Sequence, residues 1–246
     1  MSTPMPGSPR LAPGHRRNRF FAWIAVAMLA AIALGFGPTF YLRPLTDRPP
    51  LPANVVLHGV VLTAWYLLLL AQALLVARGR VELHRKLGMA GIVLAAAVFA
   101  SGVQVNLALV GRVPPEMREM AIGFATMGIG GLLAFVPLMA LAVVFRRRPA
   151  VHKRLVFWAF VITIGPAFAP SRPFGAFLDS LVAPALPFFP SDLVWFAALL
   201  AYDWRTLHRI HPVTWVGFLV LALYLVVVVE AMAAHPAVRG WVAAWS

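Results

Sequence analysis

Long apolar stretches separated by short polar segments run along almost the whole chain. Seven stretches have the length and composition of buried helices, and the first is almost wholly apolar. They lie at residues 20–42, 55–77, 88–111, 120–145, 155–170, 193–207 and 213–234. A helix needs about 20 consecutive apolar residues to cross the hydrocarbon core of a bilayer. The pattern therefore predicts an all-α protein, a polytopic transmembrane helix bundle of about seven spans.

The sixth stretch is the weakest of the seven. Its core, LVWFAALLAY, holds only 10 residues. It reaches a spanning length only if Ser191 and Asp192 cap it and Trp204–Leu207 extend it. Ser191 directly after Pro190 is typical of a helix N-cap. A bundle of six spans is the alternative.

Polar segments flank the apolar region. Residues 1–19 contain prolines and four arginines and are predicted to form a disordered basic tail in the cytoplasm. Residues 20–234 are the predicted bundle, and residues 235–246 are a short periplasmic C-terminal stretch. The first apolar stretch is longer than a signal-peptide core, and no small-residue cleavage site follows it. It is therefore predicted to stay as the first span.

Composition and charge agree with a protein embedded in lipid. The chain is 61% hydrophobic and 12% charged, whereas soluble domains average about 25% charged residues. With the N-terminus inside, 15 of the 21 Lys and Arg residues fall on the cytoplasmic side, where basic residues accumulate. The net charge of +13 is thus explained by topology and by anionic lipid headgroups at the inner face. Nucleic-acid binding is disfavoured because the basic residues lie in short loops between apolar stretches.

Two of the cytoplasmic segments carry nearly the same phrase. RVELHRKLG (Arg80–Gly88) and RPAVHKRLV (Arg148–Val156) both place Arg, two residues, an aliphatic residue, His, two basic residues and Leu at the entry of an odd-numbered helix. A third segment, DWRTLHRIHP (Asp203–Pro212), offers a shorter version. The basic residues fix orientation. The histidines need another explanation, because neutral imidazole carries no charge near pH 7.

Five phrases in order carry a resemblance to a known group. They are GPTFYLRPL (Gly37–Leu45), LHGVVLTAW (Leu57–Trp65), LHRKLG (Leu83–Gly88), HKRL (His152–Leu155) and RIHPVT (Arg209–Thr214). Together they resemble a widespread group of small, uncharacterised bacterial integral membrane proteins. The resemblance implies a multi-pass protein of the bacterial inner (plasma) membrane with about seven helices, and it brings no activity. A looser likeness connects the chain to His-bearing bundles such as b-type cytochromes and proteins of cytochrome oxidase assembly.

Four histidines at the inner face are the candidate cofactor ligands: His84, His152, His208 and His211. Haem b takes two axial imidazoles at one depth on facing helices, and the inner histidines share a depth. The common register of His84 and His152 within the repeated phrase predicts that these two face each other. Two alternatives stay open. The histidines bond helix-end carbonyls or lipid phosphate at the interface, or they handle protons.

A second candidate set lies toward the outer face. His58 begins a stripe with Trp65 and Gln72, spaced by seven residues and therefore on one face of the second helix. An ionisable residue in a span is costly and suggests function. The predicted polar ligand pocket consists of His58, Gln104, Asn106 and Glu230. The alternative is that Glu230 reaches the lipid headgroups and His58 caps a helix end.

The remaining motifs exclude several chemistries and assign no catalytic residue. The chain has no cysteine, so disulfides, thiol nucleophiles and Cys-ligated metals are excluded. It has no phosphate-binding Gly-rich loop, no Gly-x-Ser-x-Gly and no His-Glu-x-x-His motif. Two functions remain. One is a redox or cofactor-handling membrane protein that binds a cofactor through histidine, with haem b as the first candidate. The other is a non-enzymatic transporter-like or assembly protein, which leaves a partner membrane protein open.

Reporter fusions test the predicted topology. Fusions after Arg148 should report the cytoplasm, and fusions after Glu116, after Asp179 and at Ser246 should report the periplasm, because the charge bias orients each hairpin. A cytoplasmic report from Ser246 would mean that the sixth stretch does not span and that six helices cross the membrane.

Overall fold

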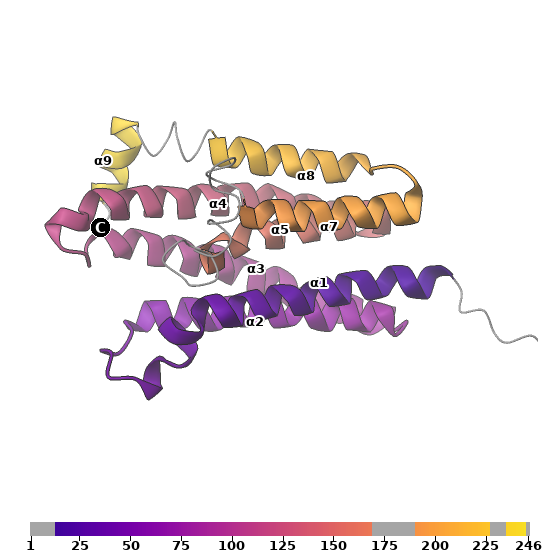
Figure 1. Cartoon of the computed structure of the whole chain (residues 1–246), viewed down its shortest axis with the longest axis horizontal. Coiled ribbons are helices and arrows are strands. Elements are labelled where there is room, and N and C mark those ends of the chain that lie inside the picture. The colour runs from indigo at the N-terminus through magenta and orange to yellow at the C-terminus, as the bar shows by residue number, and fades with distance from the viewer. Residues whose placement is uncertain (1–12, 169–189, 227–234, 245–246) are drawn as a thin grey trace, which may run out of the picture.

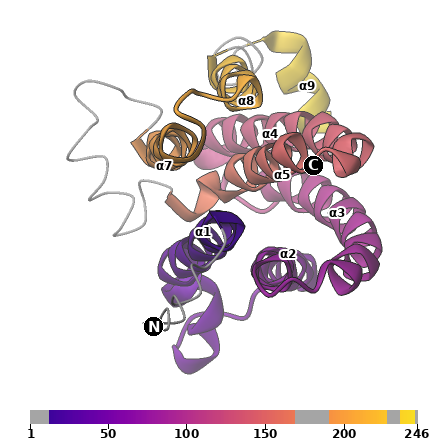
Figure 2. The same ribbon diagram turned by 90° about the vertical axis from the view of Figure 1, so that its right-hand side faces the viewer.

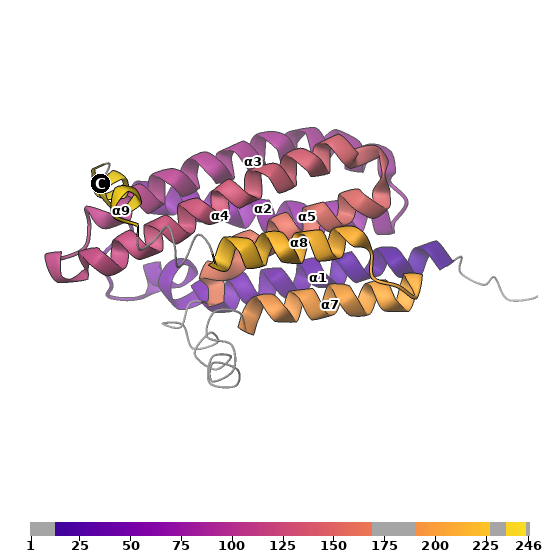
Figure 3. The same ribbon diagram turned by 90° about the horizontal axis from the view of Figure 1, so that it is seen from above.

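The computed structural model describes residues 13–168, 190–226 and 235–244. Within these residues all regular elements are helical, so the predicted all-α bundle is confirmed. The elements are α1 (Pro13–Phe36), α2 (Ala53–Ala77), α3 (Val81–Val110), α4 (Arg118–Val144), α5 (Pro149–Ile164), α7 (Pro190–Leu207), α8 (Pro212–Leu223) and α9 (Pro236–Ala244). The first seven of these lie roughly along one common axis (Figures 1 and 3).

Successive helices alternate in direction, so the connections gather at two ends of the bundle (Figure 1). One end holds the start of α1 and the turns at residues 78–80, 145–148 and 208–211. We call it the basic end because its exposed side chains include Arg19, Arg78, Arg80, Arg85, Lys86, Arg146, Arg147, Arg148, Arg205 and Arg209. The opposite end holds the α1–α2 and α3–α4 connections and α9. Figure 2 shows α5 in the middle, surrounded by α1, α3, α4, α7 and α8.

Among the residues that the structure describes, five helices are long and apolar enough to cross a membrane by length and composition. These candidate spans are Arg19–Tyr41, Ala53–Ala77, Val81–Val110, Pro115–Arg147 and Pro149–Phe168. This is the architecture of a membrane protein. The apolar helix Pro212–Val226 is shorter, and α7 is not one of the five. The count of seven spans and the cytoplasmic N-terminus therefore stay predictions.

The helices begin earlier than the apolar pattern indicates. Helix α3 starts at Val81 and α5 at Pro149, so the repeated phrase forms the first turns of two helices. Arg and Lys are good helix formers, and their long stems carry the charge toward water while the backbone stays helical. Proline suits the first position of a helix because the missing N–H has no partner there. Likewise, α1 begins at Pro13, within the stretch predicted as a tail.

Aromatic side chains interlock α2, α4 and α5 at the centre of the bundle. The Trp65 ring stacks on Phe160 with 4.4 Å between ring centroids and meets the Phe135 ring edge-on at 5.7 Å. The neighbouring Tyr66 hydroxyl donates to the Phe160 carbonyl at 3.0 Å. Helix α8 also packs closely on α5. A Cβ added to Gly217 of α8 would lie 2.0 Å from the Trp158 ring of α5. These contacts make α5 the most buried helix of the bundle.

Helix α9 lies against the end of the α3–α4 hairpin. Its Val242 is buried with Val110, Ala121 and Ala125 in a small second core. Arg239 of α9 forms an ion pair with Glu119 at the start of α4. The predicted C-terminal stretch is therefore a helix packed on the opposite end.

A buried ion pair joins α5 to α7. The side chain of Arg154 is 1% exposed and that of Asp203 is 0% exposed. The Arg154 Nε donates to Oδ1 of Asp203 at 3.0 Å, and Nη2 donates to the same oxygen. The remaining Arg154 nitrogen, Nη1, donates to the Ala150 carbonyl at 2.6 Å. Every guanidinium nitrogen therefore has an acceptor, which a buried charge requires.

The other oxygen of the same carboxylate holds α8. Oδ2 of Asp203 accepts from the Thr214 hydroxyl at 2.6 Å and from the His211 backbone N–H at 3.0 Å. One carboxylate thus connects three helices through Arg154, His211 and Thr214. We call this set of four residues the clamp.

Removing the carboxylate should destabilise the bundle. Asp203→Ala leaves the Arg154 charge buried without its partner, a change that costs about 3–5 kcal/mol in comparable sites. The thermal unfolding midpoint in detergent should fall strongly. The matched control is Glu82→Gln, because the Glu82–Lys86 pair is 2.8 Å long but 72–83% exposed and contributes at most about 0.5 kcal/mol. Equal midpoints for both variants would contradict the role of the clamp.

Candidate functional site

Two imidazoles from different helices meet near the basic end. The rings of His84 and His152 lie 6.4 Å apart between centroids, with their planes at 81°. Each histidine is the fourth residue of its helix, α3 and α5. Helix entries with equal register at the same end of the bundle give the two side chains a similar depth. The structure thus brings together the two histidines of the repeated phrase.

His152 is oriented by a bond to the neighbouring helix. Its Nδ1 lies 2.8 Å from the Ala142 carbonyl of α4. A carbonyl oxygen only accepts, so Nδ1 carries the proton and donates. In the neutral ring the lone pair then resides on Nε2. This arrangement is common in metal-ligating histidines, whose second nitrogen donates to a carbonyl or carboxylate.

His84 has a nitrogen without a hydrogen-bond partner. Its Nδ1 is buried and makes no hydrogen bond to the described residues. The Gln72 side-chain oxygen, Oε1, is likewise buried without a partner in the described part of the chain. Its amide nitrogen lies 3.5 Å from the position of a Cβ on Gly88, one turn beyond His84. The histidine pair and the Gln72 amide therefore come from three helices, α2, α3 and α5.

The other two inner histidines do not join this pair. His208 is exposed at the end of α7 and has a φ of 53°, in the left-handed region. His211 caps α8, where its Nδ1 accepts from the Val213 N–H at 3.1 Å, and its backbone belongs to the clamp. The predicted set of four ligands thus separates into a facing pair and two turn residues. Within the described ranges, no group of three or more His, Asp or Glu residues could hold a metal ion.

The predicted outer pocket is only partly assembled. His58 Nδ1 bonds the Ser101 hydroxyl of α3 at 3.0 Å. That hydroxyl donates to the Ala97 carbonyl at 2.7 Å, so it accepts from His58. The Asn106 amide nitrogen donates to the Gly102 carbonyl at 2.8 Å. Only the bond between His58 and Ser101 joins two helices, α2 and α3, because the other two bonds lie within α3.

Of the remaining two pocket residues, the structure describes only Gln104. Gln104 is exposed on α3, so the structure does not bring it to His58. Glu230 lies outside the described residues. Asn106 packs instead against α4, where a Cβ on Gly128 would lie 2.1 Å from its side-chain oxygen. The role of the four residues as a ligand pocket stays a prediction.

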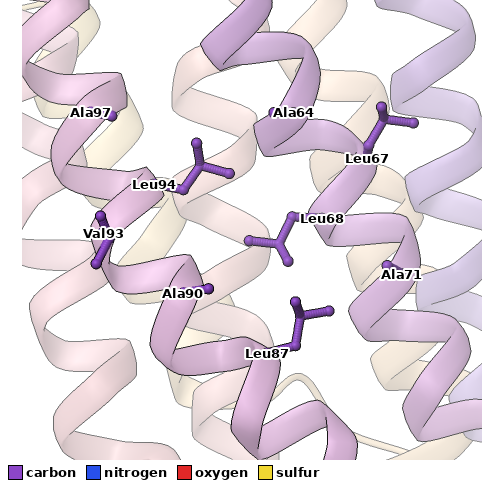
Figure 4. A pocket seen from close by; sticks show the side chains of 9 residues that line it. All are labelled: Ala64, Leu67, Leu68, Ala71, Leu87, Ala90, Val93, Leu94 and Ala97. Atoms are coloured by element: carbon purple, nitrogen blue, oxygen red, sulfur yellow. The ribbon is translucent and has the colours of Figure 1, made fainter.

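Two clefts lie on the bundle surface, and apolar side chains line both. The first, about 740 Å³, lies between α2 and α3 and is lined by Ala64, Leu67, Leu68, Ala71, Leu87, Ala90, Val93, Leu94 and Ala97 (Figure 4). The second, about 460 Å³, lies between α3, α4 and α9. Its one hydroxyl, on Thr126, donates to the Ile122 carbonyl. Neither cleft includes His84 or His152, and both surfaces suit acyl chains better than a polar ligand.

Comparison with known proteins gives no family: no family model, no curated protein and no solved structure matches the chain. The geometry of the histidine pair is therefore the basis for a function.

The cap at His211 should make stability depend on pH. Burial lowers the pKa of His211 below its ordinary value of 6.5, and the nearby Arg154 charge lowers it further, against the opposing effect of Asp203. Folding therefore favours the neutral ring, whose Nδ1 must accept from Val213. This stabilisation is present above pH 6.5 and is lost as the pH falls through the folded-state pKa.

The experiment is thermal unfolding in detergent between pH 7.5 and pH 5. His211→Asn keeps a capping acceptor and should show a smaller loss of midpoint on acidification than the unsubstituted protein. His208→Asn, at an exposed histidine three residues away, should follow the unsubstituted protein. Identical pH profiles for all three proteins would contradict the assignment.

Proposed function

We propose that this multi-pass membrane protein holds a metal centre between His84 of α3 and His152 of α5, in a redox or cofactor-handling role. The observation that carries the proposal is the facing pair of imidazoles, 6.4 Å apart between ring centroids. Metal–imidazole bonds are about 2.0–2.1 Å long, so the separation suits one metal atom between two ring nitrogens.

The hydrogen bonds around the pair support a ligand role. The bond from His152 to Ala142 leaves its Nε2 free as a lone-pair donor. The Nδ1 of His84 is buried and has no hydrogen-bond partner among the described residues. An unpaired buried polar atom costs free energy of about 1–3 kcal/mol, and a bound metal would recover that cost. A purely structural role for the histidine pair would not offset this free-energy cost.

Two kinds of metal centre fit this pair of imidazoles: haem iron and a free metal ion. The iron of haem b needs only two protein ligands, since the porphyrin supplies the others. Haem also needs a flat space, and neither apolar cleft includes the pair. A free transition-metal ion needs less room and further ligands. The shared chemistry is a metal bound by imidazole nitrogens, and the experiment below separates the two kinds of centre.

Location and orientation belong to the same proposal. We infer a bacterial inner-membrane protein with the basic end in the cytoplasm, where its exposed arginines contact anionic lipid headgroups. The metal centre would then lie near the cytoplasmic surface. The transporter-like or assembly alternative has less support, because Gln104 faces outward and both clefts are apolar.

The test uses the full chain, purified in detergent with a purification tag that contains no histidine. We expect a stoichiometric metal by elemental analysis. A Soret band that shifts on reduction would identify haem, and its absence would identify an ion. His84→Ala and His152→Ala should each lower metal occupancy at least about tenfold. His208→Ala, at an exposed histidine of the same end, should leave occupancy unchanged. A metal-free, colourless protein would refute the proposal, as would equal occupancy in all variants.

A further inference from the structure

Gln72 is half-buried, and its side-chain oxygen is buried without a partner in the described part of the chain. Gln72 lies near the end of α2, and this oxygen is its Oε1. A buried amide oxygen without a partner is unusual in a native structure, because the group loses its bonds to water and gains none. A bound ion is one explanation for such an atom.

The position of Gln72 connects it to the histidine pair. Its side-chain nitrogen lies against Gly88 of α3, one turn from His84 and therefore on the same face of that helix. The two histidine rings are themselves adjacent. One amide and two imidazoles from three helices therefore lie in the same part of the bundle, and two of these groups have a buried atom without a partner in the described part of the chain.

We propose that Gln72 is the third protein ligand of the centre held by His84 and His152, and that this centre is a late first-row transition-metal ion, such as zinc or copper. The inference rests on the proposed function and narrows it. Imidazole nitrogens suit both metals, and mixed sites of nitrogen and oxygen donors are typical of Cu²⁺. Magnesium and calcium prefer sets of oxygen ligands that include carboxylates.

The ligand count separates an ion from haem. In a haem with two axial histidines, the porphyrin and the imidazoles fill every position on the iron, so Gln72 would have no role. With an ion, three protein ligands leave a position open for water or a substrate. That is the arrangement of catalytic zinc sites, whereas structural zinc sites have four protein ligands. The open position makes this a site for a reactive or exchangeable ligand.

The test measures the affinity of the full chain in detergent for Zn²⁺ and Cu²⁺, by competition with a chelator of known affinity. Gln72→Leu keeps the approximate volume and removes the oxygen, so it should weaken Zn²⁺ binding about tenfold or more. Gln72→Glu supplies a charged oxygen and should bind at least as tightly as the unsubstituted protein. Gln104→Leu removes an exposed amide from α3 and is the matched control, with unchanged affinity.

A spectroscopic measurement separates ligation from folding. The visible absorption and electron paramagnetic resonance of the Cu²⁺ form should change on Gln72→Glu and stay unchanged on Gln104→Leu. A purely structural role for Gln72 would shift the unfolding midpoint without shifting these spectra.

The outcomes of these experiments separate a failure of the Gln72 inference from a failure of the proposed function on which it rests. Histidine-dependent metal binding that Gln72→Leu leaves intact, with unchanged Cu²⁺ spectra in Gln72→Glu, would overturn the role of Gln72 alone. A stoichiometric Soret band would overturn the ion and keep the metal centre. Absence of any bound metal, with no affinity for Zn²⁺ or Cu²⁺, would overturn both.

Discussion

The Asp203 carboxylate is the constraint on which the arrangement of the last helices depends. A charge in an apolar bundle is tolerated only when every lone pair has a donor, and here the donors come from α5 and from the start of α8. Satisfying the carboxylate therefore fixes the rotation of α5. Successive helix residues are about 100° apart, so His152 and Arg154 point to nearly opposite sides. The clamp on one side of α5 thus directs His152 to the other, toward α3 and α4.

The same helix geometry explains which sequence predictions could succeed. Helix order and type follow from the apolar stretches, because length and composition decide them locally. The contact between His84 and His152 follows from register, since equal positions at equivalent helix entries reach equal depth. The hydropathy pattern does not predict the starts of α3 and α5, because it does not distinguish Arg and Lys in a helix from Arg and Lys in a loop. In fact their stems extend the helix beyond the apolar core.

The ion pair and the outer pocket show that the apolar pattern of the sequence does not predict which side chains meet between helices. Arg154 has the same appearance in the sequence as the arginines that only set topology, and its partner lies 49 residues away. Which arginine turns inward depends on how α5 and α7 pack, which no local pattern encodes. The predicted outer pocket contains both Gln104 and Asn106. Residues two apart on a helix, however, point about 200° apart. Asn106 faces α4, and Gln104 therefore faces away.

The 49-residue separation within the clamp has a consequence for biosynthesis. At a translation rate of about 5–20 residues per second, Asp203 leaves the ribosome roughly 2–10 s after Arg154. During this interval the nascent α5 carries an arginine whose carboxylate partner does not yet exist. The helix can stay near the membrane surface, with the guanidinium among lipid phosphates, until α7 is made. Arrival of the α7–α8 hairpin would then exchange phosphate for carboxylate, and assembly of the bundle would be completed by its last-made helices.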